Sequence, residues 1–139
     1  MSSTRGTTLS GAEFQLLRTE TLAAAKTLGS GDSGKVFTLS AATGKAITLP
    51  SVAVDGFNAK FVVGAVFATT NFTIVAPTSV IQGGAHVNSV FVPAANENTI
   101  SFVATAETVG DYINIVSDGT NYYVDGFGAG TGSITFTAV

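Results

Sequence analysis

The sequence predicts an all-β fold, either an antiparallel β-sandwich, a jelly-roll-like domain or a barrel, preceded by an extended N-terminal arm. From residue 35 onward, short segments alternate apolar and polar residues with period two, as half-buried strands do. Residues that favour turns separate these segments at intervals of about 8–12 residues, which is typical of sandwiches and barrels. No internal repeat of fixed period is visible, so the pattern does not indicate a repeat protein.

The N-terminal part divides the chain into an arm, residues 1–19, and a β-sandwich domain, residues 20–139. Residues 1–12 are small and polar, and alone they bury too little apolar surface to offset the entropy of ordering them. Residues 13–28 are ambiguous, because Ala23–Lys26 favours a helix while the threonines on either side favour extended structure. We expect a short helix or an extended segment that leads into the first strand.

The first clear strands follow a glycine-rich turn. Lys35–Ser40 and Lys45–Leu49 flank a four-residue turn that ends in Gly44, so we expect a β-hairpin. Pro50 ends the second strand because it cannot donate a hydrogen bond to a neighbouring strand. Asn58–Ala68 is almost entirely apolar, which predicts a long strand buried on both faces, with a bulge at the glycine in its middle.

The second half continues in the same pattern. Four more strands are expected at Phe72–Ala76, Val80–Gln82, His86–Val92 and Thr99–Ala104. The clearest alternation is in Asp111–Ser117, which places Ile113 and Ile115 on one face and Tyr112 on the other. The Asp-Gly step within residues 118–121 predicts a hairpin to the next strand, residues 121–125. A glycine-rich loop and a last strand, residues 133–138, end the chain.

The composition excludes several classes of site. With no Cys and one His among 139 residues, the chain has no disulfide, zinc finger, thiol nucleophile or multi-histidine metal site. Six Lys and Arg residues are too few for general nucleic-acid binding. Residues 29–35 match the glycine spacing of a phosphate-binding loop, but a strand follows instead of a helix. Residues 31–34 match the sequence around a serine-protease nucleophile, but the one histidine, His86, lies downstream instead of upstream.

The chain carries no recognisable targeting or membrane segment. Its first residues lack the apolar stretch of a signal peptide. The longest apolar run, Phe61–Ala68, is far shorter than the roughly 20 residues that cross a bilayer. We therefore expect a soluble protein, made in a cytosol, with no membrane partner.

Charge is both scarce and unevenly placed. Only 11% of the residues are charged, and the mean hydropathy is +0.43. Residues 1–60 contain all six cations and have a net charge of +2, whereas residues 61–139 have a net charge of −5. A charge-poor surface is typical of the centre of a protein interface. We therefore expect subunits that pack against one another or against an acidic partner, the alternative being a Thr- and Ser-rich monomer.

Two groups of side chains are candidates for a site. Glu107, Asp111, Asp118 and Asp125 could meet at loop tips as paired carboxylates or as Ca²⁺ ligands, but they lack EF-hand spacing, and two of them precede a turn glycine. The second group is a possible exposed aromatic patch: Tyr112, Tyr122, Tyr123 and Phe127. Cross-strand packing is the other interpretation of these rings. We predict no enzyme, no catalytic residue, no metal and no cofactor.

Four stretches carry a resemblance to a known class of proteins. Residues 26–28, 32–39, 44–50 and 115–124 resemble a module in virion proteins of tailed bacteriophages, where it occurs in head decoration (cement) proteins and in tail fibres and spikes. A free-standing chain of this size is more similar to a decoration protein. The resemblance implies a small β-rich domain, often a homotrimer, that is made in the host cytoplasm and clamps major capsid proteins on the outer surface of the head. It implies no catalytic residues.

In this interpretation the arm binds a neighbouring subunit. The expected contact residues are Arg5, Phe14, Leu16, Leu17 and Arg18, with the apolar ones as anchors. Two other classes stay open: a receptor- or glycan-binding module of a tail fibre or spike that uses the aromatic patch, and a small hydrolase that uses the loop carboxylates.

Overall fold

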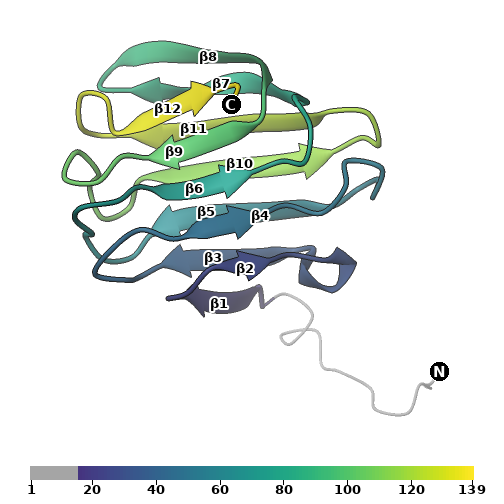
Figure 1. The fold of residues 1–139 in the computed structure, drawn as a ribbon, viewed down its shortest axis with the longest axis horizontal. Coiled ribbons are helices and arrows are strands. Elements are labelled where there is room, and N and C mark those ends of the chain that lie inside the picture. The colour runs from purple at the N-terminus through teal and green to yellow at the C-terminus, as the bar shows by residue number, and fades with distance from the viewer. Residues whose placement is uncertain (1–15) are drawn as a thin grey trace.

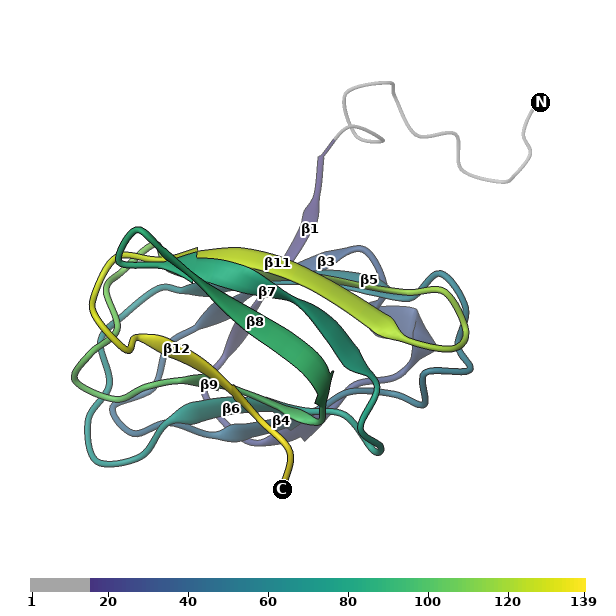
Figure 2. The same ribbon diagram turned by 90° about the horizontal axis from the view of Figure 1, so that it is seen from above.

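The computed structural model describes residues 16–139, and within them the all-β prediction is confirmed. Two sheets pack face to face with the hydrophobic core between them (Figure 2). The described elements are β1 (Arg18–Leu22), β2 (Lys26–Thr27), the 3₁₀ turn η1 (Ser30–Asp32), β3 (Lys35–Leu39), β4 (Ala46–Thr48), β5 (Asn58–Val63), β6 (Phe72–Val75), β7 (Ile81–Val87), β8 (Val90–Glu97), β9 (Thr99–Phe102), β10 (Tyr112–Ser117), β11 (Tyr122–Gly128) and β12 (Ile134–Thr137).

The two sheets differ in the number and the order of their strands. The seven-stranded sheet, here sheet A, has the order β1-β3-β5-β10-β11-β7-β8. The five-stranded sheet, sheet B, has the order β12-β9-β6-β4-β2. In Figure 1 the strands of both sheets run horizontally, with β1 and β2 at the bottom and β8 and β12 at the top. The sandwich prediction is confirmed, with the difference that both sheets mix parallel with antiparallel pairs.

In the first half of the domain, successive strands alternate between the two sheets, so the chain winds around the core; we name this part the parallel coil. β1, β3 and β5 are parallel neighbours in sheet A, and β2, β4 and β6 are parallel neighbours in sheet B. Each passage through sheet B therefore serves as the crossover that two parallel strands of sheet A need. The expected hairpin between residues 35–40 and 45–49 is wrong, because the turn before Lys45 carries the chain into the other sheet.

The burial of side chains in these strands shows why the sequence could not distinguish a hairpin from a crossover between the sheets. Phe37 and Leu39 of β3 and Ile47 of β4 are fully buried, as the alternating pattern predicts. The pattern fixes which side chains face inward, but it does not say whether two successive strands share a sheet or face one another across the core. Of the ambiguous segment 13–28, residues 18–22 and 26–27 are extended, and sheet A begins at Arg18, inside the segment expected to be arm.

The second half closes the sandwich with antiparallel pairs. β10 and β11 form the expected hairpin, and the Asp118 carboxylate accepts hydrogen bonds from the backbone N–H groups of Thr120 (2.9 Å) and Asn121 (2.8 Å) in its turn. β5 ends at Val63 and alternates buried with partly exposed residues, so the expected long strand buried on both faces is wrong. β5 instead pairs on its free side with β10, which joins the parallel coil to the hairpin.

At the edge formed by β1 and β2, a cluster of ion pairs closes the space between the sheets. Lys35 contacts Glu20 and Asp32, both at 2.8 Å, and Lys26 contacts the same two carboxylates at 2.6 and 3.3 Å. Burial raises the pKa of Asp32, but hydrogen bonds from Lys35, the Gly29 backbone and Lys26 outweigh it and lower that pKa to about 2. Inward-pointing charges of this kind protect an open edge from unwanted strand pairing.

Candidate interaction surface

The predicted contact residues at the N-terminus differ in their surroundings. Leu16 and Leu17 are 73% and 71% exposed, as anchors for a partner would be. Arg18 instead binds its own chain, because its guanidinium donates to the backbone carbonyls of Gly31 (3.2 Å) and Ser33. It therefore fixes the loop around η1 to the start of β1. Arg5 and Phe14 lie outside the described residues.

Four side chains form a row across the outer face of sheet A, which we name the aromatic row: Tyr112, Phe127, His86 and Phe91. The strand register places Tyr112 opposite Phe127, Phe127 opposite His86, and His86 opposite Phe91. Four adjacent strands, spaced about 4.8 Å apart, therefore carry a line of rings about 14 Å long. Phe127 and Phe91 are 46% and 52% exposed, and the His86 and Phe91 rings meet edge to face at 5.4 Å.

Polar groups and one cation surround the row. The Lys60 ammonium lies 4.5 Å from the centre of the Tyr112 ring, which is a cation–π contact at one end of the row. Two residues further along the β10–β11 hairpin, on the same face, the Asn114 amide donates a hydrogen bond to the Asp125 carboxylate at 3.3 Å. Beyond that pair, Val116 and Tyr123 lie opposite one another and are 45% and 44% exposed. The outer face thus alternates apolar and polar rows.

The structure places three of the four residues of the predicted aromatic patch on one face and buries the fourth. Tyr112, Tyr123 and Phe127 lie on the outer face of sheet A, but Tyr122 is fully buried. Its ring packs edge to face against Phe57, and its hydroxyl donates to the Pro50 carbonyl at 2.6 Å. Burial raises the pKa of this phenol to about 12. Successive strand residues point to opposite faces, so Tyr122 and Tyr123 cannot share one patch.

Sequence reasoning missed His86 and Phe91 as members of this surface. They occur far from the β10–β11 hairpin in the sequence, on β7 and β8. Only the order of strands in sheet A brings β7 beside β11 and β8 beside β7. Alternation within β7 could have placed His86 on an outer face, but no local signal shows which strand lies next to it.

The four loop carboxylates do not form one site. Asp118 and Asp125 lie on the β10–β11 hairpin, whereas Glu107 and Asp111 lie in the loop between β9 and β10. Asp111 is buried and accepts hydrogen bonds from the backbone N–H groups of Thr108 (2.9 Å) and Ala129 (3.0 Å), so it ties two loops together. Within residues 16–139, no three His, Cys, Asp or Glu side chains are grouped to hold a metal ion.

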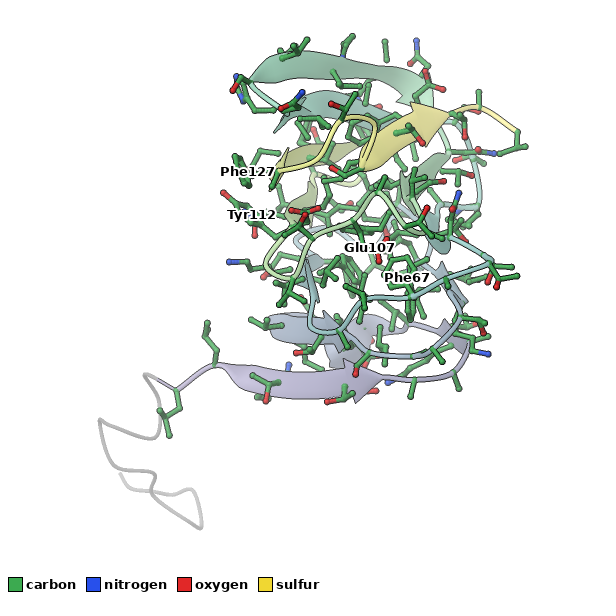
Figure 3. All side chains as sticks on the ribbon, turned by 90° about the vertical axis from the view of Figure 1, so that its left-hand side faces the viewer. Phe67, Glu107, Tyr112 and Phe127 are labelled. Carbon is green, nitrogen blue, oxygen red and sulfur yellow. The ribbon has the colours of Figure 1, made fainter. Side chains whose placement is uncertain are left out.

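Glu107 lines a pocket of about 400 Å³ at one end of the sandwich. The other lining residues come from the loops that follow β3, β5 and β9: Ala42, Val66, Phe67, Ala68 and Thr105. Figure 3 views the molecule from this end and shows Glu107 beside Phe67, with Tyr112 and Phe127 projecting from sheet A. The Oε1 atom of Glu107 accepts a hydrogen bond from the Phe67 backbone N–H at 3.0 Å.

Comparison with known proteins adds no relative. No protein-family model, no curated protein and no solved structure matches the chain. Among residues 16–139, no helix is long and apolar enough to span a bilayer.

Proposed function

We propose that the chain is a structural protein of a tailed-phage virion, a decoration protein that binds the outer surface of the head and stabilises contacts between major capsid proteins. The observation that carries the proposal is the outer face of sheet A, where the aromatic row and the Val116–Tyr123 pair expose apolar side chains between few charges. Aromatic residues are enriched where proteins bind one another, and charged residues are depleted there. The resemblance of four sequence stretches to phage virion modules supports the choice of partner.

The mechanism is mass action. A protein that binds assembled capsid subunits and not free ones stabilises the shell by RT ln(1 + [L]/Kd) for each occupied site, which is about 2.7 kcal/mol when its concentration is a hundred times Kd. A rigid two-layer domain suits this role, because it loses little conformational entropy on binding. Homotrimers at the junctions between capsid subunits, with residues of the arm on neighbouring subunits, would multiply the effect through avidity.

The test is sedimentation with heads of the encoding phage that were assembled without this chain. We expect saturable binding to such heads, no binding to unassembled capsid protein, and a higher temperature of head disruption after binding. Removal of residues 2–15 leaves β1 and the Arg18 contacts in place, and we expect it to weaken head binding without unfolding the domain. Failure of the full chain to sediment with such heads would refute the proposal.

A second function, glycan binding by a tail fibre or spike module, is favoured by one specific observation. Tyr112 and Phe127 lie beside the Asn114–Asp125 pair on the same face. Sugars bind where an aromatic ring offers a stacking platform and nearby amides and carboxylates accept and donate hydrogen bonds. A glycan array probed with the full chain separates the two functions. Selective glycan binding that is lost on Phe127→Ser would favour the fibre module.

A further inference from the structure

The one histidine of the chain lies in the middle of the aromatic row. His86 is exposed on β7, and the strand register places Phe127 on one side of it and Phe91 on the other. Neighbouring strands lie about 4.8 Å apart, so a partner that covers the two phenylalanines also covers the imidazole between them. Histidine is the side chain whose charge ordinarily changes between pH 5 and 8. A titratable group therefore lies inside the surface that carries the proposed function.

The neighbours of His86 keep this part of the row in one arrangement. The His86 and Phe91 rings meet edge to face, with their centres 5.4 Å apart. The Phe91 ring also lies against the backbone of Gly84, because a Cβ added there would come within 2.6 Å of a ring atom. The turn between β7 and β8 consists of Asn88 and Ser89, which both have positive φ, as in the tight two-residue turns that fix the register of a hairpin. The surface around His86 is therefore formed before any partner binds.

No carboxylate of the described residues forms an ion pair with His86, because all their ion pairs lie in the cluster at the β1–β2 edge. β7 contains no charged residue, and neither does the turn after β7 or the loop at residues 129–133. The strands beside β7 and further along the row contribute four titratable groups: Asp125 on β11, Glu97 on β8, Tyr112 on β10 and Lys60 on β5.

None of these four groups provides a counter-ion for a protonated His86. Asp125 is the nearest in the register, and its carboxylate accepts a hydrogen bond from the Asn114 amide. Glu97 lies opposite the first residue of β7, five positions before His86, which is about 16 Å away along the strand. Lys60 lies over the Tyr112 ring at the other end of the row, where it adds positive charge.

These surroundings favour the neutral imidazole once a partner covers the row. In the free chain, water solvates the exposed His86 in either form. Between Phe91, Phe127 and a partner, the protonated form becomes a buried cation without a counter-ion, which is costly. A carboxylate of the partner placed over His86 would itself be buried between two phenyl rings, so an apolar surface of the partner is the better match.

We propose that His86 makes head binding depend on pH, so that the chain binds with a neutral His86 and is released when His86 is protonated. This inference rests on the proposed function and adds the regulation of the same surface. Binding is complete above the pH range in which a free imidazole loses its proton, and it weakens as the pH falls through that range. For a histidine with the ordinary pKa of about 6.5, the largest weakening of binding is about tenfold at pH 5.5.

Sedimentation with the heads at pH 8.0 and pH 5.5, at one ionic strength, tests the proposal on the full chain. We expect the Kd to be at least fivefold higher at pH 5.5. The ion cluster should stay intact over this range, because the pKa of Asp32 is about 2, and the Tm measured at each pH checks that the domain is folded.

Two substitutions at position 86 separate its charge from its shape. His86→Gln removes the titratable group, and its Kd at pH 5.5 should be within twofold of its Kd at pH 8.0, whatever its affinity. His86→Arg is positively charged at both pH values, so it should show the same small ratio and bind at pH 8.0 at least fivefold more weakly than His86→Gln. The matched control is Asp125→Asn, which removes the nearest carboxylate and should keep the pH dependence of the full chain.

The outcomes distinguish this inference from the proposed function. An equal ratio of the two Kd values in the full chain and in His86→Gln would overturn the assignment to His86, and tighter binding of the full chain at pH 5.5 would overturn the sign. In both cases the chain still binds heads, so the proposed function stands. Absence of head binding at both pH values would overturn the proposed function and this inference together.

Discussion

Two carboxylates of this fold each accept two backbone N–H groups, and replacing each by its amide measures what the buried arrangement, which uses both carboxylate oxygens, adds to stability. Asp111 is 1% exposed and accepts two backbone N–H groups, from Thr108 and Ala129. Asp118 also accepts two backbone N–H groups, but both through Oδ1, and it is exposed at the hairpin turn, where its Oδ2 accepts from the Tyr123 hydroxyl. At position 111 asparagine preserves the shape and one acceptor oxygen, and it turns an NH₂ group toward the second N–H. At position 118 its single carbonyl oxygen accepts both N–H groups, as Oδ1 of Asp118 does.

The structure sets the expected size of the two effects. A hydrogen bond to a buried charged group contributes about 1.5–3 kcal/mol, and an N–H left without an acceptor adds a desolvation cost, so Asp111→Asn should lose about 2–4 kcal/mol. A chain of this length changes its Tm by about 3–4 °C per kcal/mol, which gives a fall of about 6–16 °C. Asp118→Asn should lose less than about 1 kcal/mol, because water replaces the bond and asparagine suits the same turn.

The assay is thermal unfolding followed by circular dichroism at pH 7, with chemical denaturation as a second estimate of the free energy of unfolding. The two variants are matched, because each replaces one aspartate by asparagine and changes the net charge equally. A fall in Tm of similar size for both would refute the argument that burial of Asp111 ties the β9–β10 loop to the β11–β12 loop.

Three further predictions concern the ion cluster, the core and the backbone. The pKa of Asp32 is about 2, against its usual 3.8, so its contribution to stability is complete above pH 4 and is lost as the pH falls toward 2. Asp32→Asn should flatten that part of the curve of Tm against pH. An unchanged slope would contradict the assignment to Asp32. Tyr122→Phe removes a hydroxyl that donates to a backbone carbonyl, so it should lower the free energy of unfolding, measured in denaturant, by about 1 kcal/mol. Tyr123→Phe on the surface should lower it by less than half as much. The opposite order would contradict the burial pattern. Gly83 has φ +117°, and a Cβ there would lie 2.3 Å from a carbonyl oxygen of β11, so Gly83→Ala should lower the free energy of unfolding by more than about 2 kcal/mol. A Cβ at Gly29 would meet nothing within 4 Å, so Gly29→Ala should be near neutral. Equal effects in the same assay would contradict this geometry.

Local patterns predicted much of the fold because they report burial directly. Alternation in Asp111–Ser117 placed Ile113 and Ile115 in the core, and both are buried. The Asp-Gly step predicted the β10–β11 turn, because Asp118 caps its own turn and Gly119 adopts φ +89°. These features depend on residues within a few positions of one another.

The strand topology could not be predicted from the sequence, because it depends on contacts between residues that are far apart in the chain. The expected hairpin before Pro50 and the real coil bury the same side chains, Phe37 and Ile47, so the pattern cannot tell them apart. The aromatic row has the same limit. Tyr112 and Phe127 share a hairpin and were predicted together, whereas Phe91 joins them only through the position of β7 beside β11.

The pocket had a partial signal in the sequence. The sequence marks Glu107 as a loop carboxylate, and the roles it suggests are catalysis, Ca²⁺ binding and turn formation. Its neighbours Val66 and Ala68 come from a loop about forty positions earlier, expected to belong to a long buried strand. The early end of β5 at Val63 turns that apolar run into the wall of an exposed pocket.

Substitution of the aromatic row tests the central claim, that the outer face of sheet A is a binding surface, most directly. Head binding is measured by sedimentation for the full chain, for Phe91→Ser with Phe127→Ser, and for Val109→Ser, which removes an exposed apolar side chain (57%) in the loop before β10. We predict that the double variant binds at least tenfold more weakly, with an unchanged Tm, and that Val109→Ser binds as the unsubstituted chain does. Full-strength binding by a folded double variant would contradict the account.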